Sequence, residues 1–158
     1  MTVDAVEEPF RTQLTVRLRN GHALLGVDLP GPCRFTSGNG VDILWMGPDE
    51  YLVLAEPGRQ AELETVLRNE GAAAVTDVSA QRVTVRLTGE HARDVLAHGC
   101  AIDLDPAVSP PGTCVQTLLA RTGIVLMVRD EGCTILVRQS FANYFAAWLA
   151  DASLEYVS

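Results

Sequence analysis

Residues 43–54 read Ile-Leu-Trp-Met-Gly-Pro-Asp-Glu-Tyr-Leu-Val-Leu, two apolar runs separated by Gly-Pro-Asp-Glu. Short apolar runs on either side of such residues are typical of a β-hairpin, because Gly, Pro and Asp favour reversal of the backbone. The stretch predicts strands over Val41–Met46 and Tyr51–Ala55, joined by the four-residue connection 47–50. An antiparallel strand pair is therefore the starting point of the fold.

Upstream of this hairpin, Leu14, Val16 and Leu18 alternate with polar residues, which predicts a strand with one buried face. Asn20-Gly21 then supplies a turn, and the apolar piece 23–27 is too short to assign. Segment 29–40 contains two Pro, three Gly, a Ser and an Asn, and we interpret it as an irregular loop.

Downstream of the hairpin, the apolar spacing predicts a helix over about residues 59–70, with Gly71 placed to end it. Strands are expected over 75–79 and, from strict alternation, over 83–87. A second helix over about 92–96 is closed by Gly99, and the segment 100–112 is expected to be a loop because it contains three prolines.

The last third of the chain predicts three strands over Thr113–Arg121, Ile124–Arg129 and Cys133–Arg138, with tight turns at 122–123 and 130–132. Ser140 is then expected to cap a closing helix. Strand–helix–strand order combined with hairpins predicts an α+β fold of antiparallel-rich sheets with packed helices. With no linker in the chain, we predict a single domain over residues 1–158, with residues 1–12 as a candidate flexible tail.

The charge balance excludes several functions. Twenty acidic residues against twelve basic ones give a net charge of −8, which disfavours nucleic-acid binding. All basic residues are Arg, so Schiff-base catalysis and a Walker-type lysine are excluded. No apolar run is long enough to span a bilayer, and the acidic start is unlike a signal peptide, so a cytoplasmic, soluble protein is expected.

The four cysteines, Cys33, Cys100, Cys114 and Cys133, are expected to be reduced thiols, because a chain of this size can bury a core without disulfides. Cys114 and Cys133 lie in apolar strand patterns, where Cys packs as a small hydrophobic residue. The chain has no Cys-x-x-Cys, and its histidines do not have the spacing of helix ligands, so no metal site is predicted. His91 and His98 are expected at exposed positions of one short helix.

Catalytic motifs are sparse. Asp49-Glu50 fits a solvated hairpin turn, and Asp103 with Asp105 falls in a proline-rich loop. Neither Ser79 nor Ser140 lies in a Gly-x-Ser-x-Gly elbow, and no strand is followed by Gly-x-Gly-x-x-Gly. No catalytic, cofactor-binding or metal residue is therefore predicted on this chain.

Two features have alternative interpretations. Asp77-Val78-Ser79 either binds a ligand through its acid and hydroxyl or closes a local turn through an Asx-type hydrogen bond. The closing helix has an aromatic stripe that is either core or a partner surface, since aromatic residues are favoured at interfaces. The members of this stripe are Phe141, Tyr144, Phe145 and Trp148.

Several phrases resemble one family in both order and spacing. They are Leu44-Trp45-Met46-Gly47-Pro48-Asp49-Glu50-Tyr51-Leu52, Thr76-Asp77-Val78-Ser79, the segment 82–89, Ala92-Arg93-Asp94-Val95-Leu96, Gly99-Cys100-Ala101-Ile102-Asp103-Leu104, Pro111-Gly112-Thr113-Cys114 and the segment 137–144. Together they resemble the gamma subunit of heterotetrameric sarcosine oxidase over about residues 14–149. One departure is segment 20–30, which is shorter than the helix-bearing insertion associated with the family, so an N-terminal helix is expected to be reduced or absent.

The resemblance implies a fold like the folate-binding domain of the glycine-cleavage T protein. It also implies a non-catalytic accessory subunit whose partners are alpha, beta and delta subunits, with FAD, FMN, NAD and tetrahydrofolate held by the alpha and beta subunits. In that family, the complex oxidises sarcosine to glycine, producing hydrogen peroxide and a one-carbon unit that passes to tetrahydrofolate. This chain would stabilise or orient the large subunits. Which N-methyl amine such a complex oxidises would be decided on the other chains.

The accessory role predicts an apolar interface on this chain. The best candidates are Ile102, Leu104, Phe141, Tyr144, Phe145 and Trp148. An alternative hypothesis is a stand-alone folate-binding or one-carbon-transfer module, motivated by Asp77 and by the likeness to the T protein. A third hypothesis is a scaffold that no longer belongs to the complex.

Overall fold

The computed structural model describes residues 3–156, which form two compact units. We call residues 9–81 the hairpin unit, and residues 3–8 together with 82–156 the terminal unit. Each unit has its own sheet and its own hydrophobic cluster. We predicted a single domain over residues 1–158, and this stays a prediction, because one domain can contain two compact units.

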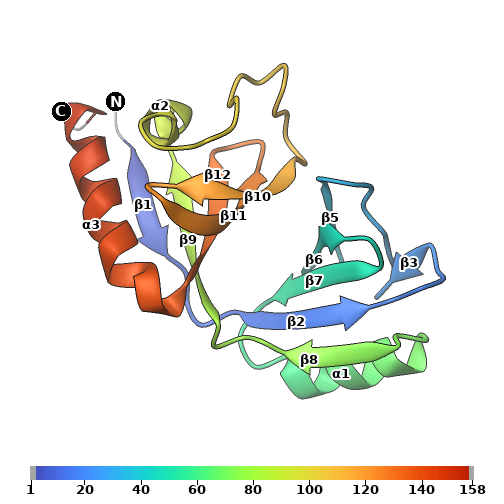
Figure 1. Ribbon diagram of the computed structural model, residues 1–158. Coiled ribbons are helices and arrows are strands. Elements are labelled where there is room, and N and C mark those ends of the chain that lie inside the picture. The colour runs from blue at the N-terminus through green and yellow to red at the C-terminus, as the bar shows by residue number, and fades with distance from the viewer. Residues whose placement is uncertain (1–2, 157–158) are drawn as a thin grey trace. The chain divides into compact units, whose positions relative to one another are not determined.

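The hairpin unit is built on a five-stranded antiparallel sheet in the order β5-β6-β7-β2-β8 (Figure 1). Its strands are β2 (Thr12–Arg17), β5 (Phe35–Gly38), β6 (Val41–Gly47), β7 (Glu50–Ala55) and β8 (Ala74–Asp77). The predicted hairpin is confirmed as β6 and β7. Its connection is shorter than predicted, because Gly47 and Glu50 pair with each other and only Pro48 and Asp49 remain in the turn.

Helix α1 (Gln60–Asn69) packs Leu63 and Leu67 into the core of the hairpin unit. It ends as predicted at Gly71, whose φ of 98° lies in the left-handed region that glycine tolerates. The amide of Gly71 donates to the carbonyl of Arg68, and that of Ala72 to the carbonyl of Leu67. These two bonds form a Schellman motif, which satisfies carbonyls that the helix end would otherwise leave unpaired.

Segment 29–40 is not wholly irregular as predicted, because it contains β5, which pairs with β6 from Phe35–Leu44 to Gly38–Val41. Ser and Gly are poor strand formers, so the ladder with β6, rather than local propensity, stabilises this edge. Segment 20–30 contains no helix, as expected. Instead it forms the short ribbon of β3 (Ala23–Leu24) and β4 (Val27–Asp28).

The terminal unit has a second five-stranded antiparallel sheet, in the order β1-β9-β12-β11-β10. Its strands are β1 (Asp4–Glu7), β9 (Arg82–Thr88), β10 (Cys114–Leu119), β11 (Thr122–Val128) and β12 (Cys133–Arg138). Residues 4–7, within the candidate tail, thus pair with β9 as an edge strand. The predicted α+β class with antiparallel sheets is confirmed, whereas the likeness to the T-protein domain stays a prediction.

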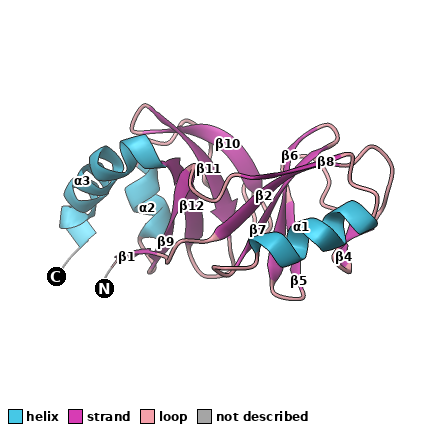
Figure 2. Cartoon of the chain, turned by 90° about the horizontal axis from the view of Figure 1, so that it is seen from below, coloured by secondary structure: helices cyan, strands magenta, loops and turns pink. Residues whose placement is uncertain are grey.

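Two helices cover one face of this sheet: α2 (Ala92–Ala97) and α3 (Ala142–Ser153) (Figures 1 and 2). Short 3₁₀ turns precede and follow α3, at Gln139–Phe141 and Leu154–Tyr156. Alternate residues of β11 and β12, such as Leu126 and Ile135, meet Leu96 and Phe145 in the core of the terminal unit.

Two local predictions for the terminal unit were wrong. The turn between β10 and β11 lies at Ala120-Arg121, not at 122–123, because Leu119 pairs with Thr122 and Leu118 with Gly123. Both turn residues have left-handed φ values, 52° and 66°, as the twist of a two-residue hairpin requires. Ser140 is not a helix cap, since it lies inside the 3₁₀ turn and α3 begins after Phe141 without a side-chain cap.

Candidate functional site

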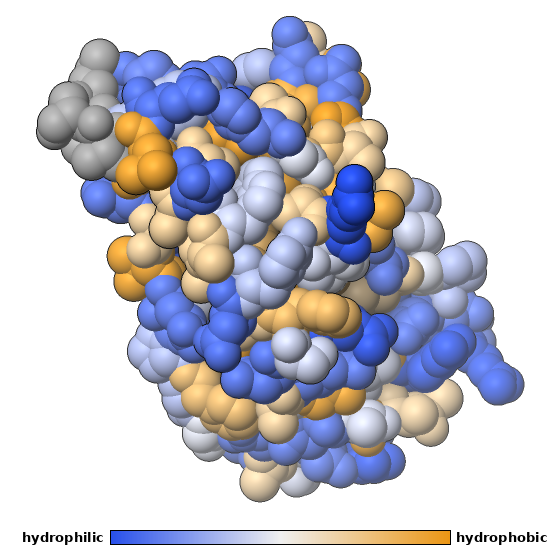
Figure 3. Space-filling view, turned by 60° about the vertical axis from the view of Figure 1, so that its left-hand side comes forward, coloured by the Kyte–Doolittle hydropathy of each residue, from blue (hydrophilic) through white to orange (hydrophobic). Residues whose placement is uncertain are grey.

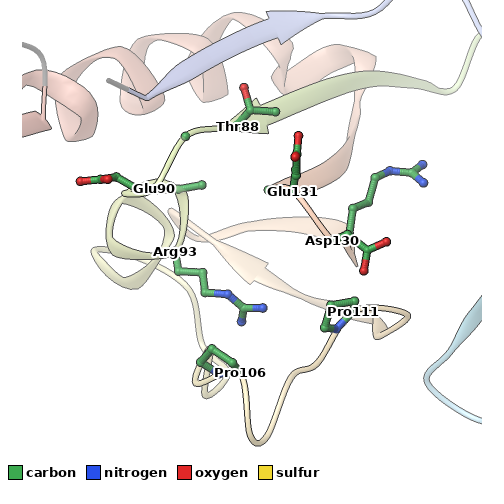
Figure 4. Close-up of a pocket in the computed structure, with 11 residues that line it drawn as sticks. Thr88, Glu90, Arg93, Pro106, Pro111, Asp130 and Glu131 are labelled. Atoms are coloured by element: carbon green, nitrogen blue, oxygen red, sulfur yellow. The ribbon is translucent and has the colours of Figure 1, made fainter. Parts of the chain in front are cut away.

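A polar cleft of about 600 Å³ opens in the terminal unit between the start of α2, the loop after it and the turn that joins β11 to β12. Figure 4 shows Arg93 extending from α2 toward the loop that contains Pro106 and Pro111, while Asp130 and Glu131 come from the turn. Its lining includes the charged residues Glu90, Arg93, Arg129, Asp130 and Glu131.

The arginines of this cleft are bonded to the protein itself. Arg93 Nη1 donates to the carbonyl of Leu104 and, at 3.1 Å, to that of Ser109, so it fixes the loop after α2. Arg129 Nε donates to the hydroxyl of Thr134 at 2.6 Å. The lining residues include no His, Cys or Ser; their hydroxyl and carboxylate groups are those of Thr88, Glu90, Asp130 and Glu131.

The loop carboxylates Asp103 and Asp105 also have local roles. Asp103 Oδ1 accepts the amide of Asp105 at 2.9 Å, and Asp105 Oδ1 accepts the amide of Ala107 at 2.8 Å. Both are hydrogen bonds of the Asx type, which turn the backbone. These two residues therefore shape the loop rather than form an acid–base pair.

Asp77 and Ser79 lie close together, as their spacing suggested. Asp77 Oδ1 accepts both the amide of Ser79, at 3.0 Å, and its hydroxyl, at 2.6 Å. The buried Ser79 hydroxyl in turn accepts the amide of Gln13 at 2.9 Å. The Asx-type interpretation is confirmed, and the motif joins the ends of β2 and β8. A contact between the Asp77 carboxylate and the pterin of folate would have to use Oδ2, because Oδ1 is engaged in this motif.

Asp49 and Glu50 lie at the β6–β7 hairpin, as predicted. Asp49 has a φ of 61° and its carbonyl accepts the amide of Leu18, so its role is in the turn. Glu50 lies 3.8 Å from the guanidinium of Arg17 on the neighbouring strand β2. Neither carboxylate lines the groove of the hairpin unit that residues 26–28 and 36–39 form.

His91 and His98 both contact Tyr156, a residue that the sequence reasoning missed. The rings of His91 and Tyr156 stack with centroids 5.0 Å apart, and His98 Nε2 lies 3.1 Å from the Tyr156 hydroxyl. His91 also contacts Asp94, at 2.9 Å, and Glu90, at 3.1 Å. No signal near Tyr156 indicated this contact. Within residues 3–156, no cluster of three or more His, Cys, Asp or Glu is arranged to bind a metal ion.

The cysteines are all free thiols in the part of the chain that the structure describes. Cys114 and Cys133 are buried in strands, which confirms their prediction as small core residues. Burial raises the pKa of the Cys133 thiol from its ordinary 9.0 to about 11, against a smaller lowering by Arg93. This thiol therefore stays protonated and unreactive at neutral pH.

The predicted interface residues separate into two groups. Phe145 and Leu104, with exposed fractions of 1% and 8%, belong to the core of the terminal unit, and Ile102 and Trp148 pack partly buried against it. Phe141 and Tyr144 are 46% and 51% exposed. The helical spacing in the sequence did not show which of these residues are buried and which are exposed. The reason is that the start of α3 extends past the edge of the face that is buried against the sheet.

Tyr144 and Trp148 of α3 lie against backbone outside the strands, at Ala120 and at Gly99. The Tyr144 hydroxyl donates to the carbonyl of Ala120 at 2.8 Å, in the turn between β10 and β11. The ring of Trp148 lies so close to Gly99 that a Cβ there would come within 2.7 Å of its Cζ2 atom. Tyr144 is therefore held in a fixed orientation while half of its surface stays exposed.

No helix within residues 3–156 has the length and apolar character needed to cross a membrane.

Comparisons with known proteins agree with these observations. The gamma subunit of sarcosine oxidase from Corynebacterium sp. strain P-1 is 35% identical over 169 residues, covering 99% of this chain and 83% of the relative. The corresponding subunit from Arthrobacter sp. is 34% identical over 164 residues, covering 96% and 80% of the two chains.

A solved structure is similar over nearly the whole chain. Heterotetrameric sarcosine oxidase from Corynebacterium sp. U-96, in complex with pyrrole 2-carboxylate, contains a chain that matches with a TM-score of 0.82 and 31% identity. The match covers 99% of this chain and 86% of that one. The model of the family described as sarcosine oxidase, gamma subunit family matches residues 16–155 of this chain. The chain therefore belongs to the sarcosine oxidase gamma subunit family.

Proposed function

We propose that this chain is a non-catalytic subunit of a heterotetrameric, sarcosine oxidase-like flavoenzyme complex, in which it stabilises or orients the larger subunits. The observation that supports this role best is that α3 and the turn before it contain both buried and exposed large side chains. Phe145 and Leu149 of this helix are core residues, whereas Phe141 and Tyr144 leave about half of their surface exposed. Aromatic side chains that are fixed before binding lose little entropy on association, so they are suited to an interface.

Two apolar residues of the same unit, Ile102 and Trp148, are partly buried and pack against its core. The view that brings the left-hand side of Figure 1 forward shows hydrophobic residues at the surface among polar ones (Figure 3). We define the aromatic surface as Phe141 and Tyr144, with Trp148 and Ile102 at its margin.

The lack of His, Cys and Ser in the lining of the cleft beside α2 supports a role without chemistry on this chain. Oxidative demethylation of sarcosine to glycine, with hydrogen peroxide and a one-carbon unit for tetrahydrofolate, would take place on the partners. FAD, FMN, NAD and tetrahydrofolate would be bound by the alpha and beta subunits, and a delta subunit would complete the complex. The complex is expected in the cytoplasm.

The test is to co-express this chain, tagged, with the proteins that its chromosomal neighbours encode. The expected eluate is yellow, contains larger subunits and oxidises N-methyl amines. A colourless, solitary 17.0 kDa species would contradict the proposal. Binding of reduced folate to that species in calorimetry would then favour a stand-alone folate-binding module.

The aromatic surface is tested by Phe141→Ser in the same co-expression. Phe10→Ser is the matched control, because Phe10 is also exposed, at 59%, but lies in the hairpin unit. We expect Phe141→Ser to lower the yield of complex at equal chain expression, and Phe10→Ser to leave it unchanged. Equal yields from both variants would place the interface elsewhere.

A further inference from the structure

A groove of about 480 Å³ lies in the terminal unit between α3 and the strands β1 and β9 at one side of its sheet. Among the described residues that line this groove, only Glu7 of β1 is charged. The rest of the lining is mostly apolar and includes Ala5, Val83, Val85, Ala142, Ala146 and Ala150. This groove therefore differs from the cleft beside α2, whose lining contains several charged residues.

The groove is open because α3 has small residues on the side that faces it. Ala142, Ala146 and Ala150 are four residues apart, so they lie on one side of the helix. The large residues next to them, Phe145 and Leu149, are buried in the core, with exposed fractions of 1% and 3%. Alanine side chains are too short to cover β1, whose four residues are all exposed. The helix side of the sheet is therefore uncovered at this strand.

β1 is the outermost strand of this sheet and pairs only with β9 in the part of the chain that the structure describes (Figure 1). The amide of Glu8, directly after β1, donates to the carbonyl of Thr84 on β9 at 2.8 Å. Residues of an antiparallel strand direct their backbone groups alternately toward and away from the neighbouring strand. The backbone of Val6 therefore also faces β9, whereas Ala5 and Glu7 direct their N–H and C=O groups to the open edge. The two β1 residues whose side chains line the groove thus also present their backbone groups beside it.

An open strand edge is a template for another strand, so it indicates which kind of segment fits here. Three of residues 4–8 are acidic, namely Asp4, Glu7 and Glu8. Two copies of this chain paired at β1 would bring these carboxylates together, and like charges on neighbouring strands are destabilising. A segment with Arg or Lys opposite Glu7 would instead be attracted, and the net charge of −8 favours its approach at longer range. Because side chains alternate along a strand, the residue two positions from that cation would lie beside Ala5 and could enter the groove.

We propose that β1 and the groove beside it bind an extended segment of a larger subunit, which adds a strand to the terminal sheet. The segment has a basic residue opposite Glu7 and, two positions away, an apolar side chain in the groove against Val85 and Ala146. This inference rests on the proposed function, because it names the chemistry of the partner segment. In this mode of binding, hydrogen bonds to the backbone of Ala5 and Glu7 supply affinity, while the groove and the Glu7 carboxylate supply selectivity.

The test is competitive assembly. Wild-type and variant chains are co-expressed in equal amounts with the larger subunits, and their ratio in the purified complex is measured by mass spectrometry. Ala5→Pro removes an N–H that faces the open edge and leaves the bonds from β1 to β9 in place, because an edge strand tolerates proline at such a position. Ala146→Leu fills the groove with a side chain that favours helix. Glu7→Lys opposes the basic residue of the partner.

Two of these variants have matched controls in the hairpin unit. Ala61→Leu makes the same change as Ala146→Leu, at an exposed position of α1. Asp28→Lys makes the same change of charge as Glu7→Lys, at an exposed position of β4. The control for Ala5→Pro is the melting temperature of the isolated chain, which should not change if this N–H is unused in the fold.

We expect Ala5→Pro, Ala146→Leu and Glu7→Lys each to be incorporated at least about tenfold less than wild type, and the two controls equally with it. Ala146→Leu should keep or raise the melting temperature of the isolated chain, which separates docking from folding. If Ala5→Pro does not fold, the other two variants decide the outcome.

Equal incorporation of Ala146→Leu or Glu7→Lys, or of a folded Ala5→Pro, would overturn the inference while the proposed function stands. Absence of the wild-type chain from any complex would overturn both. Self-association of the isolated chain in ultracentrifugation that Ala5→Pro abolishes, together with unaffected assembly, would identify a second copy of this chain as the occupant and reject the segment of a larger subunit.

Discussion

The hydroxyl of Tyr144 donates a hydrogen bond to the carbonyl of Ala120, across 2.8 Å and 24 residues of sequence. Ala120 has a left-handed φ of 52°, which costs an alanine free energy that other contacts must offset. The bond ties the start of α3 to the turn between β10 and β11. Tyr144, a member of the aromatic surface, is therefore anchored to this turn.

Tyr144→Phe removes this hydrogen bond and keeps the ring. We expect the free energy of unfolding to fall by about 1 kcal/mol, the usual net value of one such bond. Urea denaturation of the isolated chain measures it. Tyr51→Phe is the control, because it removes the same hydroxyl from a tyrosine of the hairpin unit, which does not contain this turn. An equal loss in the two variants would show that the Ala120 contact adds no stability.

Gly99→Ala tests the close approach of Trp148. The added methyl would lie 2.7 Å from the indole and 3.2 Å from the amide nitrogen of Ala120, so α3 or the turn must shift. Overpacking of this kind costs about 1–3 kcal/mol. Gly123→Ala is the matched control, because its methyl meets no atom within 4 Å. Thermal melting should rank Gly99→Ala well below Gly123→Ala, and equal melting temperatures would contradict the packing described here.

Ser79→Ala tests the motif that joins β2 and β8. The change leaves the buried amide of Gln13 without its hydroxyl acceptor, which costs about 1–3 kcal/mol. Amide hydrogen exchange at Gln13 and Ser79 should accelerate with the loss of stability. Ser140→Ala is the control, since Ser140 lies exposed in a 3₁₀ turn. If Ser79→Ala is as stable as Ser140→Ala, the Asp77–Ser79 motif has no role in stability, and ligand binding becomes the alternative role for Asp77.

The raised pKa of the Cys133 thiol predicts that the protein loses stability at alkaline pH. Its folded-state pKa of about 11 exceeds the ordinary 9.0, so the unfolded chain ionises first as the pH rises. The protonated thiol therefore makes its full contribution to the free energy of unfolding below pH 9. That contribution, about 2–3 kcal/mol, is lost as the pH rises through 11. Measurement of unfolding free energy from pH 8 to 11.5 should show a steeper fall for wild type than for Cys133→Ala. Parallel curves would exclude a buried, protonated thiol.

Much of the secondary structure followed from local pattern. The β6–β7 hairpin, α1 with its end at Gly71, and the strands β9 and β12 were predicted because each is specified by apolar period and turn residues within a few positions. The turn at Ala120-Arg121 was misplaced because Gly123 is the stronger local turn signal. Cross-strand register decided otherwise, and it placed that glycine inside β11.

The sequence by itself determined the α+β class, the lack of a catalytic motif and the family resemblance, since these depend on residue type, period and order along the chain. Only the tertiary structure decided which aromatic residues of α3 are core and which are exposed. It alone placed Tyr156 against His91 and His98, and it alone paired Gly123 with Leu118 inside the sheet. The reason is physical: burial and strand register depend on contacts between residues far apart in sequence, and a local pattern contains no record of those partners.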